Sequence, residues 1–354
     1  MIIPTEPIGS IPRPLKLIEA VRTGGGNVDS ELDLLYEEAI RDTVERFEAT
    51  GSPVITDGEQ RKFHNFWTYG VEGLPNTAPD GFTIPFAAGH VRHMPRLTTG
   101  PFRYRIYADR FLEDAMRYAH VPVKQAVISP SALSLMYPAE EISGYSRDEF
   151  LDDLLKEHET EVRRCLQRGA HCVQIDFTEG RLAVKLDPSG QLLTSFIDLN
   201  NLALSRFSEE ERNRIGVHTC PGSDCDSAHS GDVDYAELAP ALMQLRVRNF
   251  YFALANEADP VRVLKIIRNS MKPDHRIFIG VVDPTDPRIE TPEEIRDRVL
   301  VAAKYIPIEQ LGTTDDCGFS PFSDDTSTTR DTAFAKIKAR VHGTALASEI
   351  IGGR

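Results

Sequence analysis

The chain has 354 residues, with 40 basic and 54 acidic side chains that give a formal charge of −14. This balance disfavours nucleic acid and anionic membranes as partners, because their phosphates would be repelled. The first residues, MIIPTEPIGSIPRPLK, do not form a secretory signal, and no segment has the roughly 18 apolar residues of a membrane-spanning helix. Five scattered cysteines do not indicate a disulfide framework, so we expect a cytoplasmic protein.

Helix-like and strand-like segments alternate along the chain. Residues 29–50 are expected to be helical, with Asp29 or Ser30 as the cap and Gly51 as the stop. Further helices are expected over 146–169, part of 202–214, 235–245, 260–271, 291–305 and 331–350. Short apolar strands are expected at 53–56, 125–129, 172–177, 215–218, 250–254, 276–282 and 311–314. Residues 83–108 indicate either a hairpin-like region or one barrel strand with an extension.

This alternation predicts the fold class. Apolar strands that are each followed by a helix indicate a parallel sheet. About eight such units fit an α/β protein with a single-domain (β/α)8 TIM barrel over residues 1–354. A doubly wound open sheet is the competing architecture, but it usually has a glycine-rich first turn between strand and helix, which this sequence lacks.

Polar residues gather at or just after the carboxyl ends of the predicted strands. They are Asp57, Glu59, Ser129, Asp176, His218, Cys220, Asn256, Glu257, Asp283, Asp315, Asp316 and Cys317. The carboxyl ends of barrel strands share one face, which carries the catalytic loops. The repetition of polar residues at strand after strand therefore predicts a functional site at that face.

A metal site is predicted among these residues. His218 and Cys220 are two residues apart, so in extended chain their side chains point the same way, and Cys317 follows a later strand at the same rim. Imidazole and thiolate are preferred zinc ligands, and three of them with an open position form the catalytic arrangement. Two alternatives stay open: three unrelated core residues, or a closed structural site that includes Cys225.

Five short motifs in order resemble a known family. They are residues 8–14 (IGSIPRP), 57–61 (DGEQR), 173–176 (VQID), 218–220 (HTC) and 316–318 (DCG). Over nearly its whole length the chain is similar to the catalytic barrel of cobalamin-independent methionine synthase, within the uroporphyrinogen decarboxylase/methionine synthase-like superfamily. Each motif alone is weak, but their common order favours a catalytic Zn²⁺ site.

The resemblance implies a set of metal ligands. In that family zinc takes one His, two Cys and one Glu, which implies His218, Cys220 and Cys317 here. The Glu position of the family is occupied by Leu254 in this chain. Glu257 is therefore the candidate for the fourth ligand, and the cap of the following helix is its alternative role.

The resemblance also implies how an amino-acid thiol is bound. Ser10 with the local backbone would hold its carboxylate, and Glu59 and Asp176 would hold its ammonium group. Asp57 belongs to the same motif as Glu59 and is a further candidate substrate-binding residue; a turn with solvated charges is the alternative for both.

Three departures from the family pattern concern the methyl donor. Phe177 stands where an acidic residue is usual, residues 282–288 contain no general-acid His, and the only tryptophan, Trp67, lies outside the segment that forms the family's pterin platform. Asp283 or Asp286 is therefore the candidate acid that protonates the leaving group. The donor stays open between folate, methyl-corrinoid and sulfonium, and the last two are predicted to react faster.

The expected function is zinc-dependent methylation of a small-molecule thiol, homocysteine above all, with a corrinoid protein as an open further partner. One rival is an alkyltransferase such as an epoxyalkane:coenzyme M transferase, whose sulfonate substrate would not suit Glu59 and Asp176. A metal-free decarboxylase of the same superfamily would need arginines around an acidic substrate. The third rival is not an enzyme: a barrel in which zinc has a structural role and which binds a ligand or partner.

Overall fold

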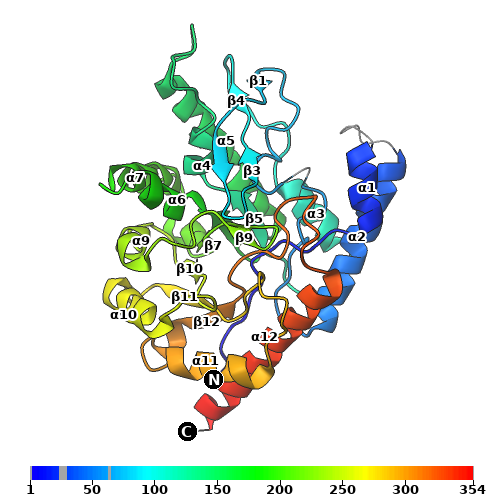
Figure 1. Cartoon of the computed structure of the whole chain (residues 1–354), viewed down its shortest axis with the longest axis vertical. Helices are drawn as coiled ribbons and strands as arrows, with labels where there is room; N and C mark the ends of the chain where they lie inside the picture. Colours follow the sequence, from blue (N-terminus) through cyan, green and yellow to red (C-terminus); the bar gives the residue numbers. More distant parts are fainter. Residues whose placement is uncertain (1, 24–29, 63–64, 354) are drawn as a thin grey trace.

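The computed structural model describes residues 2–23, 30–62 and 65–353. Its centre is a parallel six-stranded sheet with the order β5-β6-β7-β10-β11-β12 (Figure 1). Almost all residues of these strands are buried, as expected for a parallel sheet covered on both faces. The strands are β5 (Gln125–Ile128), β6 (Val173–Asp176), β7 (Ile215–Thr219), β10 (Asn249–Phe252), β11 (Arg276–Gly280) and β12 (Leu311–Thr314).

Two irregular segments, residues 5–11 and 55–58, close this sheet into a ring. The first forms a parallel bridge to β12 through Thr5, and the second forms one to the segment before β5 through Ile55. The two segments also bond to each other, because a threonine hydroxyl of the second donates to a backbone carbonyl of the first at 2.8 Å. Eight segments therefore surround one axis, and the predicted (β/α)8 barrel is confirmed.

One barrel position differs from the prediction. The first position belongs to residues 5–11, where no strand was predicted, because Pro4 and Pro7 interrupt the apolar pattern. Residues 83–108 supply no barrel strand: residues 83–97 form short antiparallel pairings, in line with the hairpin-like interpretation, and residues 98–108 form no strand. In these hairpins β1 (Thr77–Ala78) pairs with β4 (Arg96–Leu97), and β2 (Thr83–Pro85) pairs with β3 (Val91–His93).

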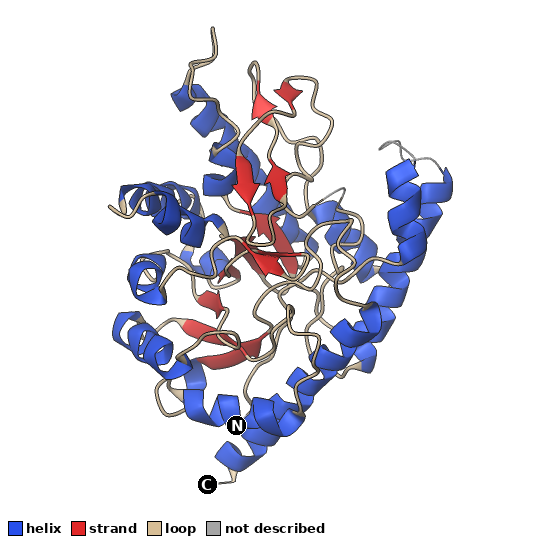
Figure 2. Ribbon diagram, in the orientation of Figure 1, coloured by secondary structure: helices blue, strands red, loops and turns tan. Residues whose placement is uncertain are grey.

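Helices surround the strands (Figure 2). All predicted helices are present, although the proposed cap Asp29 lies outside the described residues. Local signals fix their ends: in α5, Ser146 and Glu149 form a capping box, and Gly169 ends the helix with φ 98°. The helices are α1 (Leu15–Thr23), α2 (Ser30–Ala49), α3 (Asp109–Met116), α4 (Pro130–Ser134), α5 (Arg147–Arg168), α6 (Glu179–Leu186), α7 (Gln191–Leu204), α8 (Glu209–Arg212), α9 (Tyr235–Leu242), α10 (Pro260–Ser270), α11 (Pro292–Ala302), α12 (Arg330–Gly352) and the 3₁₀ turn η1 (Ile308–Gln310).

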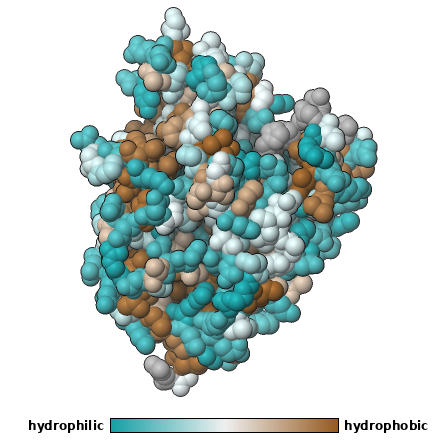
Figure 3. All heavy atoms as spheres, viewed as in Figure 1, coloured by the Kyte–Doolittle hydropathy of each residue, from teal (hydrophilic) through white to brown (hydrophobic). Residues whose placement is uncertain are grey.

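The apolar side chains form one main core and a second cluster. The main core lies between the barrel strands and the surrounding helices. The second cluster lies under the β1–β4 and β2–β3 hairpins and includes Phe66, Trp67 and Phe322. Hydrophilic residues predominate on the face shown in Figure 3, and no helix of the described chain is long and apolar enough to cross a membrane.

Candidate active site

Three buried side chains meet past the carboxyl ends of β7 and β12. His218 belongs to β7, Cys220 directly follows it, and Cys317 follows β12. One ligand atom from each lies within 4.8 Å of the other two, and the two Sγ atoms are 3.2 Å apart. Neither ring nitrogen of His218 has a hydrogen-bond partner among the described residues. The fold therefore brings together the three residues that the sequence predicted as metal ligands.

The chemistry of this group fits a zinc ion. A buried imidazole without a partner is unfavourable unless a further group binds it. The pKa of Cys317 lies well below its ordinary value, because the Cys220 thiol donates a hydrogen bond to it and, against the effect of burial, His218 lies beside it. The thiolate is the form of cysteine that binds metals, so the residues present are suited to the ion.

Asp316 fixes the position of Cys317. Its carboxylate accepts hydrogen bonds from the backbone N–H groups of Leu254, Ala255 and Asn256 at 2.8, 2.8 and 2.9 Å. Burial raises the pKa of Asp316 to about 7, and these N–H groups counteract the rise. The loop after β12 is thereby attached to the loop after β10, next to the metal-ligand candidates.

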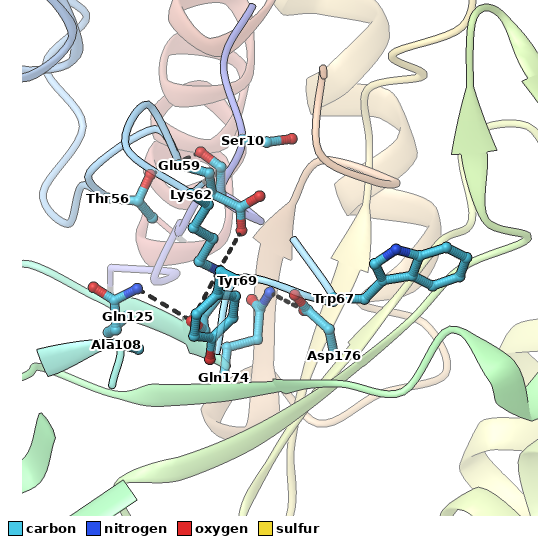
Figure 4. A network of polar contacts seen from close by, with 12 residues as sticks. Ser10, Thr56, Glu59, Lys62, Trp67, Tyr69, Ala108, Gln125, Gln174 and Asp176 are labelled. Carbon is cyan, nitrogen blue, oxygen red and sulfur yellow. Dashed lines mark hydrogen bonds and ion pairs between the residues drawn. The ribbon is translucent and has the colours of Figure 1, made fainter. Parts of the chain in front are cut away.

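Glu59 lies in a turn that two buried bases, Arg13 and Lys62, hold in place, and Figure 4 shows Lys62 beside Glu59. Its backbone is left-handed, with φ 57°. Arg13 donates to the carbonyl oxygens of Glu59 and Lys62 at 2.6 and 2.8 Å. The Lys62 Nζ is 3.0 Å from Glu59 Oε1 and donates to the Ala126 carbonyl oxygen at 3.0 Å. Glu59 therefore has a fixed position and a permanent counter-ion.

The other predicted substrate-binding residues lie nearby. Gln174 Nε2 donates to Asp176 Oδ1 at 2.7 Å (Figure 4), and the backbone N–H of Ser320 donates to Ser10 Oγ at 3.1 Å. Burial raises the pKa of Asp176 and that of Asp57 to about 6. The carboxylate oxygens of Asp57 have no hydrogen-bond partner among the described residues.

One pocket joins these groups. It is a narrow cavity with a volume of about 30 Å³. Ser10, Glu59 and Asp176 line it together with His218, Cys220 and Cys317, whereas Asp57 is not part of its lining as far as the structure describes it. Aromatic side chains complete the walls: Phe66, Trp67, Phe86, Phe322 and the ring of His229.

Three predicted residues lie away from this pocket. Glu257 is outside the group of metal-ligand candidates, and its Oε1 pairs with Arg181 Nη2 at 2.5 Å. Asp283 lines a second hollow that also contains Cys317, and its Oδ1 accepts from the hydroxyl of Thr285 at 2.7 Å. Asp286 lines neither hollow among the described residues; its carboxylate bonds to the backbone N–H of Arg288 at 2.9 Å.

The sequence did not predict Lys62, Arg13 or the aromatic walls. Lys62 follows Glu59 by three residues, a spacing that allows contact within one turn, but a charged run such as EQRK usually faces solvent. Trp67 and Phe322 are far apart in sequence, so no local pattern links them.

The fold and the site define a class of protein: a (β/α)8 barrel with an imidazole-and-thiol centre at the carboxyl ends of its strands. The family described as "Cobalamin-independent synthase, Catalytic domain" matches residues 3–338. The chain therefore belongs to the family of the cobalamin-independent synthase catalytic domain.

Known proteins are similar over almost the full chain. A methionine synthase of Sulfurisphaera tokodaii is 25% identical over 98% of this chain and 93% of its own length. One of Saccharolobus solfataricus is 24% identical over 98% of this chain and 96% of its own length. Among solved structures, a B12-independent methionine synthase from Shewanella sp. W3-18-1, in complex with selenomethionine, has a TM-score of 0.79 with 19% identity and full coverage of both chains. A putative vitamin-B12 independent methionine synthase from Listeria monocytogenes has a TM-score of 0.71 with 20% identity and 98% coverage of both.

Proposed function

We propose that this protein is a zinc-dependent S-methyltransferase that converts homocysteine to methionine. The observation that carries the proposal is the shared pocket: the His218, Cys220 and Cys317 group and the amino-acid-binding candidates Glu59 and Asp176 line the same cavity. Relatives named methionine synthase match this chain along nearly its whole length, which supports the same acceptor.

The residues of the chain would bind and orient the acceptor. The carboxylates of Glu59 and Asp176 would hold its ammonium group, and Ser10 with the adjacent backbone would hold its carboxylate. Zinc bound by His218, Cys220 and Cys317 would supply the positive charge that keeps a coordinated thiol ionised at neutral pH. With its amino-acid end fixed, the thiolate sulfur of homocysteine can attack a methyl carbon in line: the new S–C bond forms, the bond from that carbon to the donor breaks, and its electron pair stays on the donor atom.

A leaving group that needs a proton would take it from an acid near the centre. Of the two candidate acids, Asp283 is favoured by its position, because it lines a hollow shared with Cys317. Asp286 is held by the backbone of its own turn and would act through water.

The described lining of the pocket disfavours the two rival reactions. It contains Glu59 and Asp176 but no Lys or Arg among the residues that the structure describes. A sulfonate acceptor or an acidic porphyrinogen would find no Lys or Arg in this described lining to bind its anionic groups.

The test compares metal content and methyl transfer in matched variants. His218→Ala and Cys317→Ala should lose most of the zinc, measured by atomic spectrometry, and the methylation of homocysteine. Cys225→Ala is the control, because Cys225 lies in an exposed turn outside the group. Zinc loss in Cys225→Ala, or undiminished methylation in Cys317→Ala, would rule out the proposed centre.

A further inference from the structure

The pocket of the candidate active site is closed in this structure. Its volume of about 30 Å³ has room for about two water molecules, whereas homocysteine is a whole amino acid. The groups proposed to bind that amino acid, Ser10, Glu59 and Asp176, are buried as well. Part of the lining must therefore move before an acceptor of this size can enter or a product can leave.

One part of the lining comes from outside the barrel: residues 86–92, the tip of the β2–β3 hairpin (Figure 1). Phe86 of this tip lines the pocket, and it is the one side chain of the tip that packs in the second apolar cluster. The chain reverses in a tight turn, where the backbone N–H of Gly89 donates to the Phe86 carbonyl oxygen at 2.9 Å. The base of the hairpin is anchored, because Ile84 and Met94 are buried in the same cluster. The tip can therefore swing as a unit about a fixed base.

Arg92 attaches the hairpin tip to two other loops. Its Nε and Nη2 donate to the carboxylate of Asp224 at 2.6 and 3.0 Å. Its Nη1 and Nη2 donate to the carboxylate of Asp324 at 3.0 and 2.9 Å. The guanidinium also lies over the Phe322 ring, 4.3 Å from its centroid. One planar fork thus binds two carboxylates at once, a geometry that a lysine could not reproduce.

The two loops that Arg92 joins carry the thiols of the predicted metal centre. Asp224 lies four residues after Cys220, and Asp324 lies seven residues after Cys317. The loops also contact each other directly, since the backbone N–H of Cys225 donates to a carboxylate oxygen of the residue after Asp324 at 3.2 Å. The position of the hairpin tip is therefore linked to both segments that hold the thiols.

A second side chain of the tip reaches the same carboxylate. The His90 ring is stacked on Phe86 with centroids 4.7 Å apart, and its Nε2 is 2.8 Å from Asp224 Oδ2. The backbone N–H of Ala88 donates to Ser227 Oγ at 2.9 Å. The contacts of the tip with the loop after β7 are thus mostly polar, and water can replace polar contacts when they separate.

We propose that residues 86–92 are a lid, which opens to admit the acceptor and closes over it, and that Arg92 is the positioning residue that holds the lid shut. The inference rests on the proposed function for the identity of the acceptor. When the lid lifts, water reaches both Arg92 and Asp224, so neither charge stays buried without a partner. When the lid is closed, water is excluded from the thiol and its bonding partners, which strengthens the charge interactions inside the pocket.

The opening is tested first by access to Trp67. This residue is the only tryptophan of the chain, lines the pocket and is 5% exposed, so quenching of its fluorescence by acrylamide reports whether the pocket is open. In the zinc-loaded protein, Arg92→Met should raise the quenching constant severalfold. Arg96→Met is the matched control, because Arg96 also binds a carboxylate at two points, that of Asp80 at 3.2 and 3.0 Å, but lies outside the lid. This control should be quenched like the wild type.

The second measurement is the rate of homocysteine binding, followed by Trp67 fluorescence after rapid mixing. Only the open fraction of the molecules can bind, so loss of the clamp should raise the association and dissociation rate constants by about tenfold each. If Arg92 had only a structural role, Arg92→Met would lower the unfolding midpoint and leave the quenching and the rates as they are. Unchanged quenching and unchanged rates in folded Arg92→Met would overturn the lid.

Asp324→Asn keeps the test decisive if Arg92→Met does not fold. It weakens the outer half of the clamp only, because the Asp324 side chain is 63% exposed and Arg92 keeps its pair with Asp224. Quenching and binding rates should change in the same direction by a smaller factor, and no change would contradict the proposal. If homocysteine binds to none of these proteins, the proposed function fails, whereas the quenching of Trp67 still decides whether the lid opens.

Discussion

Replacement of Lys62 by methionine tests whether this buried counter-ion stabilises the turn that carries Glu59, the proposed substrate-binding residue. Lys62 Nζ lies 3.0 Å from Glu59 Oε1, and the two side chains are 0% and 4% exposed. Burial lowers the pKa of Lys62, but the nearby carboxylates, Glu59 first, outweigh this and raise it above its ordinary value, so the base is charged. Methionine keeps the length of the side chain and removes only the charge and its hydrogen bonds.

The expected loss follows from the geometry. Coulomb's law gives about 5.5 kcal/mol for two charges at this separation with an effective dielectric constant near 20. Removal of one member of a buried ion pair generally costs about 3–5 kcal/mol, because the other charge stays buried without a partner. We expect Lys62→Met to lower the free energy of unfolding by about that amount, measured by urea titration followed by circular dichroism.

Two controls make the result decisive. Lys185 also pairs with a carboxylate at 2.9 Å and with a backbone carbonyl oxygen, but it is 44% exposed and its partner Asp232 is 67% exposed. Lys185→Met should therefore cost less than about 1 kcal/mol. The double variant Lys62→Met/Glu59→Gln removes both buried charges and should recover most of the loss. The reasoning fails if Lys62→Met costs no more than Lys185→Met, or if the double variant is as unstable as the single one.

Three further outcomes are expected. Glu59→Gln should weaken homocysteine binding by about 1.5–3 kcal/mol in calorimetry without a change in zinc content, and unaltered affinity would remove Glu59 from the site. Burial raises the pKa of Glu179 to about 7, so its protonation favours the folded state below about pH 4.5, and that contribution is lost as the pH rises through 7. Glu179→Gln should therefore gain stability relative to the wild type between pH 5 and pH 8, and a gap independent of pH would contradict the assignment. Glu257→Gln should keep its zinc, because Arg181 already binds that carboxylate; loss of zinc would show that Glu257 exchanges Arg181 for the metal.

Features with local signals were predictable from the sequence. Helix α5 begins at the capping box of Ser146 and ends at Gly169, both of which can be read from neighbouring residues. The group of His218, Cys220 and Cys317 was equally predictable, because each of its residues lies at or just after the end of a recognisable strand and the fold places such ends on one face.

Features that depend on distant contacts were not predictable. The barrel position at residues 5–11 has no regular strand pattern and is recognisable only through its bridge to β12. The charge of Lys62 suggests a solvated side chain. Its burial depends on the conformation of its turn, which Arg13, 49 residues earlier in the sequence, stabilises by donating to the Lys62 carbonyl oxygen. Asp283 and Asp286 share one motif, yet the turn directs only Asp283 toward the hollow beside Cys317.

The irregular closure of the barrel has a consequence for how this protein tolerates mutation. In a regular strand the backbone makes the ladder bonds, so many different residues can occupy a position without loss of pairing. Where residues 55–62 meet residues 9–13, particular side chains bond to the backbone of the neighbouring segment. Gln60 Nε2 donates to the Ile11 carbonyl oxygen at 2.8 Å, and Arg13 Nε donates to the Gln60 carbonyl oxygen at 3.1 Å. Substitutions at Arg13 and Gln60 should therefore be accepted far less readily than substitutions in the six regular strands. If the turn that carries Glu59 binds the substrate as proposed, selection on it extends to Arg13 and Gln60, which hold the turn from behind.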